Sequence, residues 1–133
     1  MQPIFSFKIR GAYNKIANLS KQQQKRGVLT ASAGNHAQGV ANACKKLKIP
    51  CFIVMPVTTP EIKVKSVRRF GAKVLLHGDN FDQASKKAIQ IAREKKLEFI
   101  EAFDDPFTIA GQGTVGKEIF DADKDLDVIF VPV

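Results

Sequence analysis

Ser32-Ala33-Gly34-Asn35-His36-Ala37-Gln38-Gly39 is the stretch of sequence that decides the fold. The residues before it, 27–31, are partly β-branched and opened by a glycine, which is typical of a short buried strand. After it, residues 36–47 place small and apolar side chains at helical spacing. The octet 32–39 is therefore predicted to be the turn that leads from a strand into a helix.

Such a turn in a parallel sheet is a natural anion site. Free backbone N–H groups and the positive end of the helix face the crevice beyond the strand ends, where ligands bind. Ser32 and Asn35 add side-chain donors, and Gly34 lets the backbone approach a ligand closely. These features suit a small carboxylate. Because Ser and Asn before a helix are also common as plain N-caps, the whole octet carries the inference and no single residue does.

The composition is that of a folded domain without a membrane span. The chain has 133 residues, 44% of them apolar, which is enough for one core. No apolar run reaches the roughly 18 residues that a span requires, and residues 1–3 do not begin a signal peptide. Cys44 and Cys51 have no partners at metal-ligand spacing. We interpret them as buried reduced thiols of a cytoplasmic protein.

The formal net charge of +8 raises the question of nucleic-acid binding. The lysines are spread over the polar faces and ends of the expected helices, and no aromatic residues are interleaved with them to stack on bases. A solvated surface is the better interpretation, so we expect no nucleic-acid partner and no membrane partner.

Lys8 is the candidate reactive side chain. Ser6 is a plausible N-cap for a helix that runs to about Leu19, which puts Lys8 in the first turn. A cation there opposes the helix dipole, and Arg10 is close in sequence. Both effects favour the neutral, nucleophilic amine, and Gly11 removes bulk one turn later. An isolated lysine of this kind is usually an ordinary surface residue, so its identification needs the wider context.

The rest of the chain alternates strands with helices. Strands are expected near 28–31, 51–55, 73–77 and 98–101, and a final strand, 127–133, is assigned to a second domain. Helices are expected at 6–19, 36–47, 61–70, 81–96 and 104–120, and residues 20–26 are expected to be a polar connection. The alternation predicts an α/β fold, an open parallel three-layer αβα sheet with helices on both faces.

The positions of the glycines give no support for a nicotinamide dinucleotide site and predict one close contact between helices. No Gly-x-Gly-x-x-Gly motif follows a strand, so a nicotinamide dinucleotide site has no support. Gly111-Gln112-Gly113 falls inside a helical pattern, where close helix packing explains the glycines.

Two motifs together resemble a known family. Ser6-Phe7-Lys8-Ile9-Arg10-Gly11-Ala12 and the octet 32–39 closely resemble the threonine dehydratases (threonine ammonia-lyases), which are fold type II pyridoxal-phosphate enzymes of the tryptophan-synthase-β-like group. The resemblance continues in register along essentially the whole chain, through 54–56, 59–64, 76–78, 103–106, 109–114 and 130–133.

The resemblance implies a site and a reaction. Lys8 would form the Schiff base with pyridoxal phosphate and later move the substrate α-proton, and Phe7 would pack against the cofactor ring. Asn35 would bind the ring hydroxyl oxygen, while Ser32, Gly34, Asn35 and His36 would hold the carboxylate of a small amino-acid substrate. The implied reaction converts L-threonine or L-serine to 2-oxobutanoate or pyruvate and ammonia, in isoleucine biosynthesis or threonine catabolism. The implied parent enzyme is a cytoplasmic homo-oligomer.

The resemblance also implies a division of the chain. Residues 1–26 would carry the lysine-bearing helix of a larger domain, 27–115 the small αβα domain, and 116–133 the return into the larger domain. In the family, the last strand leads into a glycine-rich phosphate loop that this sequence does not reach. We therefore expect an internal fragment that is inactive alone. The alternatives are a non-catalytic remnant or partner-binding module, and a fragment of a related serine dehydratase or racemase.

Ala33 discriminates between two reactions within this resemblance. Racemising relatives carry a second serine at this place in the octet, where it acts as acid and base on the cofactor face opposite the lysine. Racemisation needs proton donors on both faces, and alanine has no transferable proton. The sequence therefore predicts a dehydratase rather than a racemase.

Overall fold

The computed structural model describes residues 4–131, which form six helices and four strands. In chain order the elements are α1 Lys8–Ala17, α2 Lys21–Arg26, β1 Val28–Ala31, α3 Asn35–Leu47, β2 Cys51–Met55, α4 Glu61–Arg68, β3 Lys73–Leu76, α5 Phe81–Lys95, β4 Glu98–Phe99 and α6 Pro106–Ala122.

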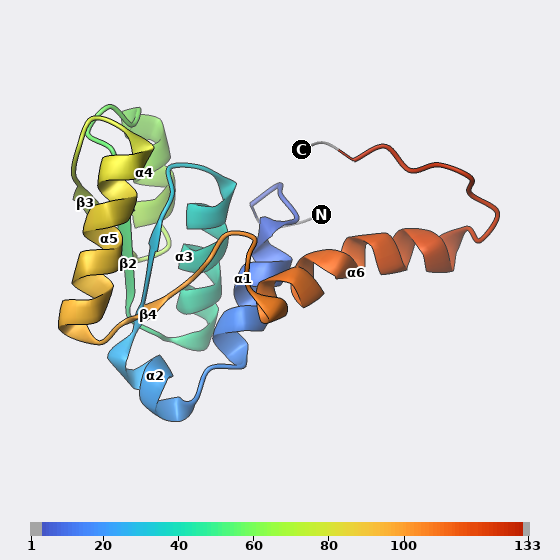
Figure 1. Ribbon diagram of the computed structural model, residues 1–133, viewed down its shortest axis with the longest axis horizontal. Helices are drawn as coiled ribbons and strands as arrows, with labels where there is room; N and C mark the ends of the chain where they lie inside the picture. The colour runs from blue at the N-terminus through green and yellow to red at the C-terminus, as the bar shows by residue number, and fades with distance from the viewer. Residues whose placement is uncertain (1–3, 132–133) are drawn as a thin grey trace.

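The four strands form one open parallel sheet, in the order β3-β2-β1-β4 (Figure 1). Strand β1 lies inside the sheet, with Val28 opposite Cys51 of β2 on one side and Glu98 of β4 on the other. All four residues of β1 are buried, as expected for a central strand of a parallel sheet that is covered on both faces.

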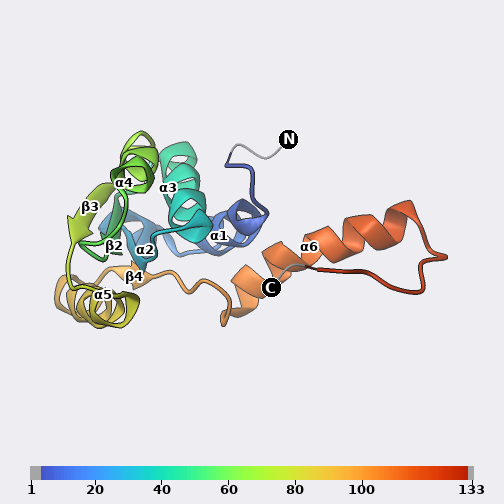
Figure 2. The ribbon, with the colours of Figure 1, turned by 90° about the horizontal axis from the view of Figure 1, so that it is seen from above.

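Helices cover both faces of the sheet, which confirms the three-layer αβα architecture. Figure 2 shows α3 and α4 on one side of the strands and α5 on the other. The larger apolar core lies on the α3 side and includes Val40, Ile53 and Val67, while the smaller core joins Leu29 and Val54 to α5. Helix α1 packs against α3, so the lysine-bearing helix belongs to the same packed body as the sheet.

Helices α1 and α2 differ from the sequence-based expectation. Helix α1 begins at Lys8 with Phe7 at the N-cap position and ends at Ala17, before Leu19. Ser6 is not the N-cap, because it lies one residue before Phe7, although its hydroxyl still accepts the N–H of Lys8 at 3.3 Å. Residues 20–26 are not merely a connection: they contain α2, which is opened by a capping box between Ser20 and Gln23.

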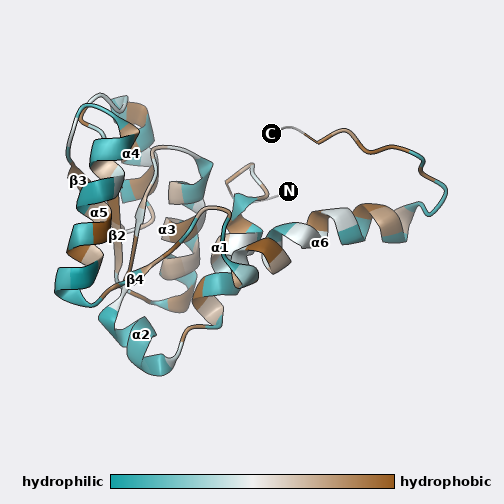
Figure 3. Ribbon diagram, viewed as in Figure 1, coloured by the Kyte–Doolittle hydropathy of each residue, from teal (hydrophilic) through white to brown (hydrophobic). Residues whose placement is uncertain are grey.

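The expected strand at 127–133 is wrong over 127–131, where the chain is irregular. A strand needs a neighbour to satisfy its backbone groups, and no other described strand pairs with this segment. Figure 3 shows it as an apolar trace beyond the end of α6, and Phe130 is 93% exposed. Residues 132–133 lie outside the described residues.

Two glycines allow α6 to pack closely on α1. A Cβ atom at Gly111 would lie 2.6 Å from Arg10 O and from Gly11 Cα. A Cβ at Gly11 would lie 2.7 Å from the side chain of Gln112, which accepts the Gly11 N–H at 3.1 Å. Close packing at Gly111 is therefore confirmed. Gly11 makes room for α6 rather than for the space above Lys8.

We expect Gly111→Ala to destabilise the fold by about 1–3 kcal/mol, because the added methyl group overlaps backbone atoms that cannot move independently. Gly113 is the matched control in the same helix, since a Cβ there meets nothing within 4 Å. Gly113→Ala should stabilise by up to about 1 kcal/mol through helix propensity alone. Urea unfolding of both variants measures the difference. Effects of the same sign and size would contradict the close crossing of α1 and α6.

Candidate functional site

The candidate site lies where the strand order of the sheet reverses. The chain runs from β1 outward to β2 and β3 and then returns to β4 on the other side of β1. In open α/β sheets, ligands bind beyond the carboxyl ends of the strands at such a point. The octet 32–39 leaves β1 here, and residues 100–105 leave β4. The sequence predicted the first of these segments as part of the site but not the second.

A glycine of α3 brings Lys8 to this crevice. A Cβ atom at Gly39 would lie 3.1 Å from Lys8 O and 3.3 Å from Ile9 Cα, so α1 approaches α3 closely because that side chain is absent. The octet and the lysine motif, which are separated in sequence, thus lie against each other. Gly39 is the last residue of the octet 32–39. The sequence did not predict that this glycine lets α1 approach α3 at Lys8.

The Lys8 side chain is half-buried and has an aromatic neighbour. Its amine donates to the backbone carbonyl of Ala102 at 3.3 Å and lies 5.5 Å from the centre of the Phe7 ring. No carboxylate of residues 4–131 forms an ion pair with it. The site therefore offers an amine free of an acidic partner, beside a ring that is 38% exposed.

Arg10 does not act on Lys8 in the way the sequence suggested. Its guanidinium turns to α6 and donates to both carboxylate oxygens of Glu118, at 2.7 and 2.9 Å, and to the Thr114 hydroxyl at 3.0 Å. The hydrogen bonds and charge of Arg10 lower the pKa of the Glu118 carboxyl. Because the charge of Arg10 is neutralised in this pair, it supplies no argument for a neutral Lys8 amine.

The start of α3 has the character expected of an anion site. The Ser32 hydroxyl oxygen accepts the N–H groups of Gly34, at 3.2 Å, and Ala37, at 3.3 Å, so Ser32 also serves as a cap. The backbone N–H groups of Asn35 and His36 have no acceptor within the described part of the chain. The space beside Gly34 is open, and Asn35 is exposed. These donors can receive a carboxylate at the positive end of the helix.

The His36 side chain is buried, unlike the other predicted site residues. Its Nε2 lies 3.1 Å from the carbonyl oxygen of Ile100, which also accepts the Thr30 hydroxyl at 2.8 Å. Burial lowers the pKa of His36 and the nearby charge of Lys8 lowers it further, against the effect of the Ile100 hydrogen bond. The imidazole is therefore neutral, and its hydrogen bond joins α3 to Ile100 inside the protein. What His36 can offer a ligand is its backbone N–H.

A comparison with protein families shows to which family the chain belongs. The family model described as pyridoxal-phosphate dependent enzyme matches residues 1–133. The chain belongs to this family. Its membership confirms the resemblance drawn from the lysine motif and the octet, and pyridoxal phosphate is the family's cofactor.

Curated relatives within the family are threonine dehydratases. The chain is 56% identical over 133 residues to threonine dehydratase of Nicotiana attenuata, covering all of this chain and 22% of that protein. It is 55% identical over 132 residues to L-threonine dehydratase biosynthetic IlvA of Haemophilus influenzae, covering 99% of this chain and 26% of that protein. The chain thus spans about a quarter of the length of these relatives.

Solved structures of the family have the same fold. The processed form of threonine deaminase isoform 2 from Solanum lycopersicum superposes with a TM-score of 0.95 at 51% identity, covering 99% of this chain and 38% of that one. Maize serine racemase superposes with a TM-score of 0.93 at 35% identity, covering 98% and 40%. The α/β fold with an open parallel sheet, expected from the resemblance to fold type II pyridoxal-phosphate enzymes, is therefore confirmed.

The residues at the crevice fit the reactive end of pyridoxal phosphate. To attack the aldehyde of the cofactor, a lysine amine must not be paired with a carboxylate. No carboxylate of residues 4–131 forms an ion pair with Lys8. A flat pyridine ring requires an apolar neighbour, and the exposed Phe7 ring lies beside the amine. Asn35 is exposed at the start of α3 and can offer its amide to a ring substituent.

An ion pair joins the start of α6 to α1. Asp105 caps α6 by accepting the N–H groups of Phe107 and Thr108, and its other oxygen lies 2.7 Å from Lys15 Nζ in α1. Burial opposes ionisation of Asp105, but the hydrogen bond and charge of Lys15 and the two N–H groups outweigh it and lower the pKa. Both side chains are less than 15% exposed.

We expect Asp105→Asn to destabilise the fold by about 2 kcal/mol at pH 7, because Asn keeps a capping oxygen but leaves the Lys15 charge with only the longer contact to Glu98, at 3.8 Å. A carboxyl whose pKa is lowered by folding stabilises above its unfolded pKa of about 3.9 and loses this effect as the pH falls through the folded value. The gap between wild type and variant should therefore shrink below about pH 4. Urea unfolding at pH 7, 5 and 3 measures it, and an unchanged gap at pH 3 would contradict the assignment.

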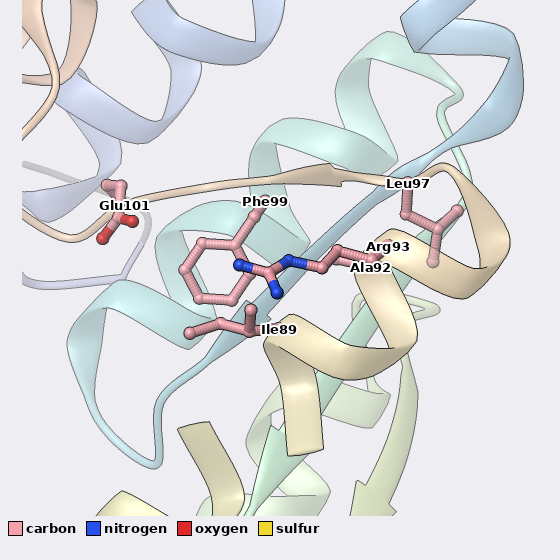
Figure 4. Close-up of a pocket in the computed structure, with 6 residues that line it drawn as sticks. All are labelled: Ile89, Ala92, Arg93, Leu97, Phe99 and Glu101. Carbon is pink, nitrogen blue, oxygen red and sulfur yellow. The ribbon is translucent and has the colours of Figure 1, made fainter. Parts of the chain in front are cut away.

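A surface hollow lies beside α5 and β4. It has a volume of about 360 Å³ and is formed by side chains of α5 and of the segment around β4. Figure 4 shows Arg93, Phe99 and Ile89 gathered there, with Glu101 set apart at one end. None of the site residues predicted from the sequence lines it.

The described residues contain neither a cluster of metal ligands nor a membrane-spanning helix. Within residues 4–131, no group of three or more His, Cys, Asp or Glu side chains is placed to hold a metal ion, and no helix is long and apolar enough to span a bilayer. Cys44 and Cys51 are buried free thiols, as expected. The neighbouring Cys51 side chain, together with burial, raises the pKa of the Cys44 thiol, which disfavours the nucleophilic thiolate of Cys44.

Proposed function

We propose that this chain supplies the lysine-bearing helix and the small domain of a threonine dehydratase. The enzyme would convert L-threonine to 2-oxobutanoate and ammonia, or L-serine to pyruvate and ammonia. The observation that carries the proposal is the packing of the Lys8 backbone against Gly39 of the octet 32–39, with the Lys8 amine beside Ala102 O and free of an acidic partner among residues 4–131. The names of the relatives, at 55–56% identity, support the choice of substrate.

Each site residue has a proposed task. Pyridoxal phosphate, when bound, supplies the electron sink for carbanion chemistry. Lys8 would hold the cofactor covalently until the substrate amine replaces it, and the freed Lys8 amine would then take the substrate α-proton on Nζ, while Phe7 would cover the ring. Asn35 donates its side-chain amide to the ring hydroxyl oxygen. The substrate carboxylate would receive the Ser32 hydroxyl hydrogen, which is left over because the Ser32 oxygen is already an acceptor, and the N–H groups of Asn35 and His36. Gly34, whose N–H is used by Ser32, would leave open space for the carboxylate.

The remaining features of the proposal concern the longer protein. Residues 1–26 and 116–133 would belong with a larger domain, and 27–115 would be the small domain, although α6 itself runs unbroken from Pro106 to Ala122. We propose a homo-oligomer that acts in isoleucine biosynthesis, as the word biosynthetic in a relative's name suggests. We propose that this protein is located in the cytoplasm. A relative from Schizosaccharomyces pombe is named as a mitochondrial threonine dehydratase.

A chimaera tests the proposed reaction. This chain would replace the matching segment of the tomato threonine deaminase, whose superposition covers 99% of it. With pyridoxal phosphate and L-threonine, the chimaera should form 2-oxobutanoate, measured by chromatography of its hydrazone, while the 133-residue chain alone should form none. A folded chimaera that binds the cofactor but produces no 2-oxo acid from either L-threonine or L-serine would contradict the proposal.

A further inference from the structure

The segment after β4 is held by hydrogen bonds to individual carbonyl groups rather than by a strand ladder. Strand β4 ends at Phe99. The next residue, Ile100, donates its N–H to Leu29 O at 2.9 Å, and its carbonyl accepts Thr30 Oγ1 at 2.8 Å and His36 Nε2 at 3.1 Å. Two residues further on, Ala102 O accepts the Lys8 amine at 3.3 Å. One short segment therefore links His36 to Lys8.

His36 is an unusual residue for its surroundings. It is 4% exposed, and within the described part of the chain its Nδ1 has no hydrogen-bond partner. A buried acceptor without a donor destabilises the fold, so packing alone would favour an apolar side chain here. Because Ile100 O can only accept, the imidazole must carry its proton on Nε2. The bond to Ile100 is thus what the histidine contributes.

We propose that His36 is a positioning residue for Lys8: its bond to the Ile100 carbonyl fixes residues 100–102 so that Ala102 O stands beside the Lys8 amine. The inference rests on the proposed function for the importance of Lys8, and on the contacts above for everything else. A lysine amine has three rotatable donors on a flexible stem. One fixed acceptor restricts where its hydrogens point and hence where its lone pair points when the amine is neutral.

Two substitutions of equal length separate the hydrogen bond from packing. In His36→Gln, the amide nitrogen can take the place of Nε2 and keep a donor for Ile100. His36→Met has a similar length and volume but no donor. Val67→Ala is a control for lost stability, since Val67 is buried in α4, away from the crevice.

Amide hydrogen exchange of the full 133-residue chain is the first measurement. His36→Met should speed exchange of the Ile100 amide, which donates to Leu29 O at 2.9 Å, about two- to tenfold over wild type, the range that loss of one neutral hydrogen bond produces. His36→Gln should remain close to wild type, and Val67→Ala should show no selective change there. Equal effects of Gln and Met, or equal effects of Met and the Val67 variant, would overturn the proposal.

The reactivity of Lys8 is the second measurement. Trace acetylation, followed by mass spectrometry of the peptides, measures the acetylation rate of Lys8 relative to that of Lys65. This ratio should differ from the wild-type value in His36→Met and should return to it in His36→Gln. An unchanged relative rate in His36→Met would overturn the link to Lys8 even if exchange is altered. Neither readout needs pyridoxal phosphate or substrate, so a failure of the proposed reaction in the chimaera is distinguishable from a failure of this inference.

Discussion

Lys8→Ala in the chimaera with the tomato enzyme is expected to lower kcat/KM for L-threonine by about 10³-fold or more, since it removes both the covalent attachment point and the proton-transfer group. No other described lysine can substitute without rearrangement. Lys15, in the same helix, pairs with Asp105 at a distance of 2.7 Å between Nζ and Oδ2. The remaining described lysines lie outside α1. The measurement is steady-state formation of 2-oxobutanoate with excess pyridoxal phosphate.

Two variants serve as controls for this result. Lys8→Arg keeps the positive charge but cannot attach to an aldehyde, so it should be as inactive as Lys8→Ala. Lys15→Ala breaks the ion pair with Asp105 and should lower the free energy of unfolding while activity survives in the folded fraction. Activity retained in Lys8→Arg would contradict covalent attachment at Lys8.

Ala33→Ser in the same chimaera is expected to raise conversion of L-serine to D-serine by about 10²-fold, the usual contribution of a positioned proton donor. Ala33 lies in the octet between Ser32 and Gly34, partly buried against the core. It offers no proton, so we expect the unsubstituted chimaera to form 2-oxo acid far faster than D-serine. Chiral chromatography of the reaction mixture measures both products.

Ala33→Val is the control for this second substitution, because it adds bulk without a hydroxyl group. It should not produce D-serine, although its added volume can slow the main reaction. The choice between the two activities matters because the chain is similar both to the tomato threonine deaminase and to maize serine racemase, with TM-scores of 0.95 and 0.93. D-serine formed by the unsubstituted chimaera at a rate near that of pyruvate would contradict the dehydratase assignment.

The sequence predicted the layered sheet well because its signals are local. Strands β1, β2 and β3 were recognised as short apolar runs, and α5 as a helix with one apolar face, with ends within one or two residues. Segment 127–131 has the same apolar character but no strand, because a strand also needs a neighbour. Helix α2 was missed although Ser20 and Gln23 carry the capping-box signal, since its six residues lack an apolar face.

The site was predictable only in part. The octet and Lys8 could be placed because strand-to-helix turns and first helical turns have recognisable residues. The carbonyl groups of Ile100 and Ala102 have no sequence signal, because every residue carries a carbonyl and only tertiary structure selects which one faces Lys8. The burial of His36 likewise depends on the return of β4 beside β1, which a local pattern cannot show.

Reductive trapping tests the central claim most directly. The chimaera, loaded with pyridoxal phosphate, is reduced with borohydride and digested, and the modified peptide is identified by mass spectrometry. We predict that the cofactor is fixed on the peptide containing Lys8 at near-stoichiometric yield, and that Lys8→Ala abolishes this labelling. Cofactor fixed mainly on another lysine, or equal labelling in Lys8→Ala, would contradict the account.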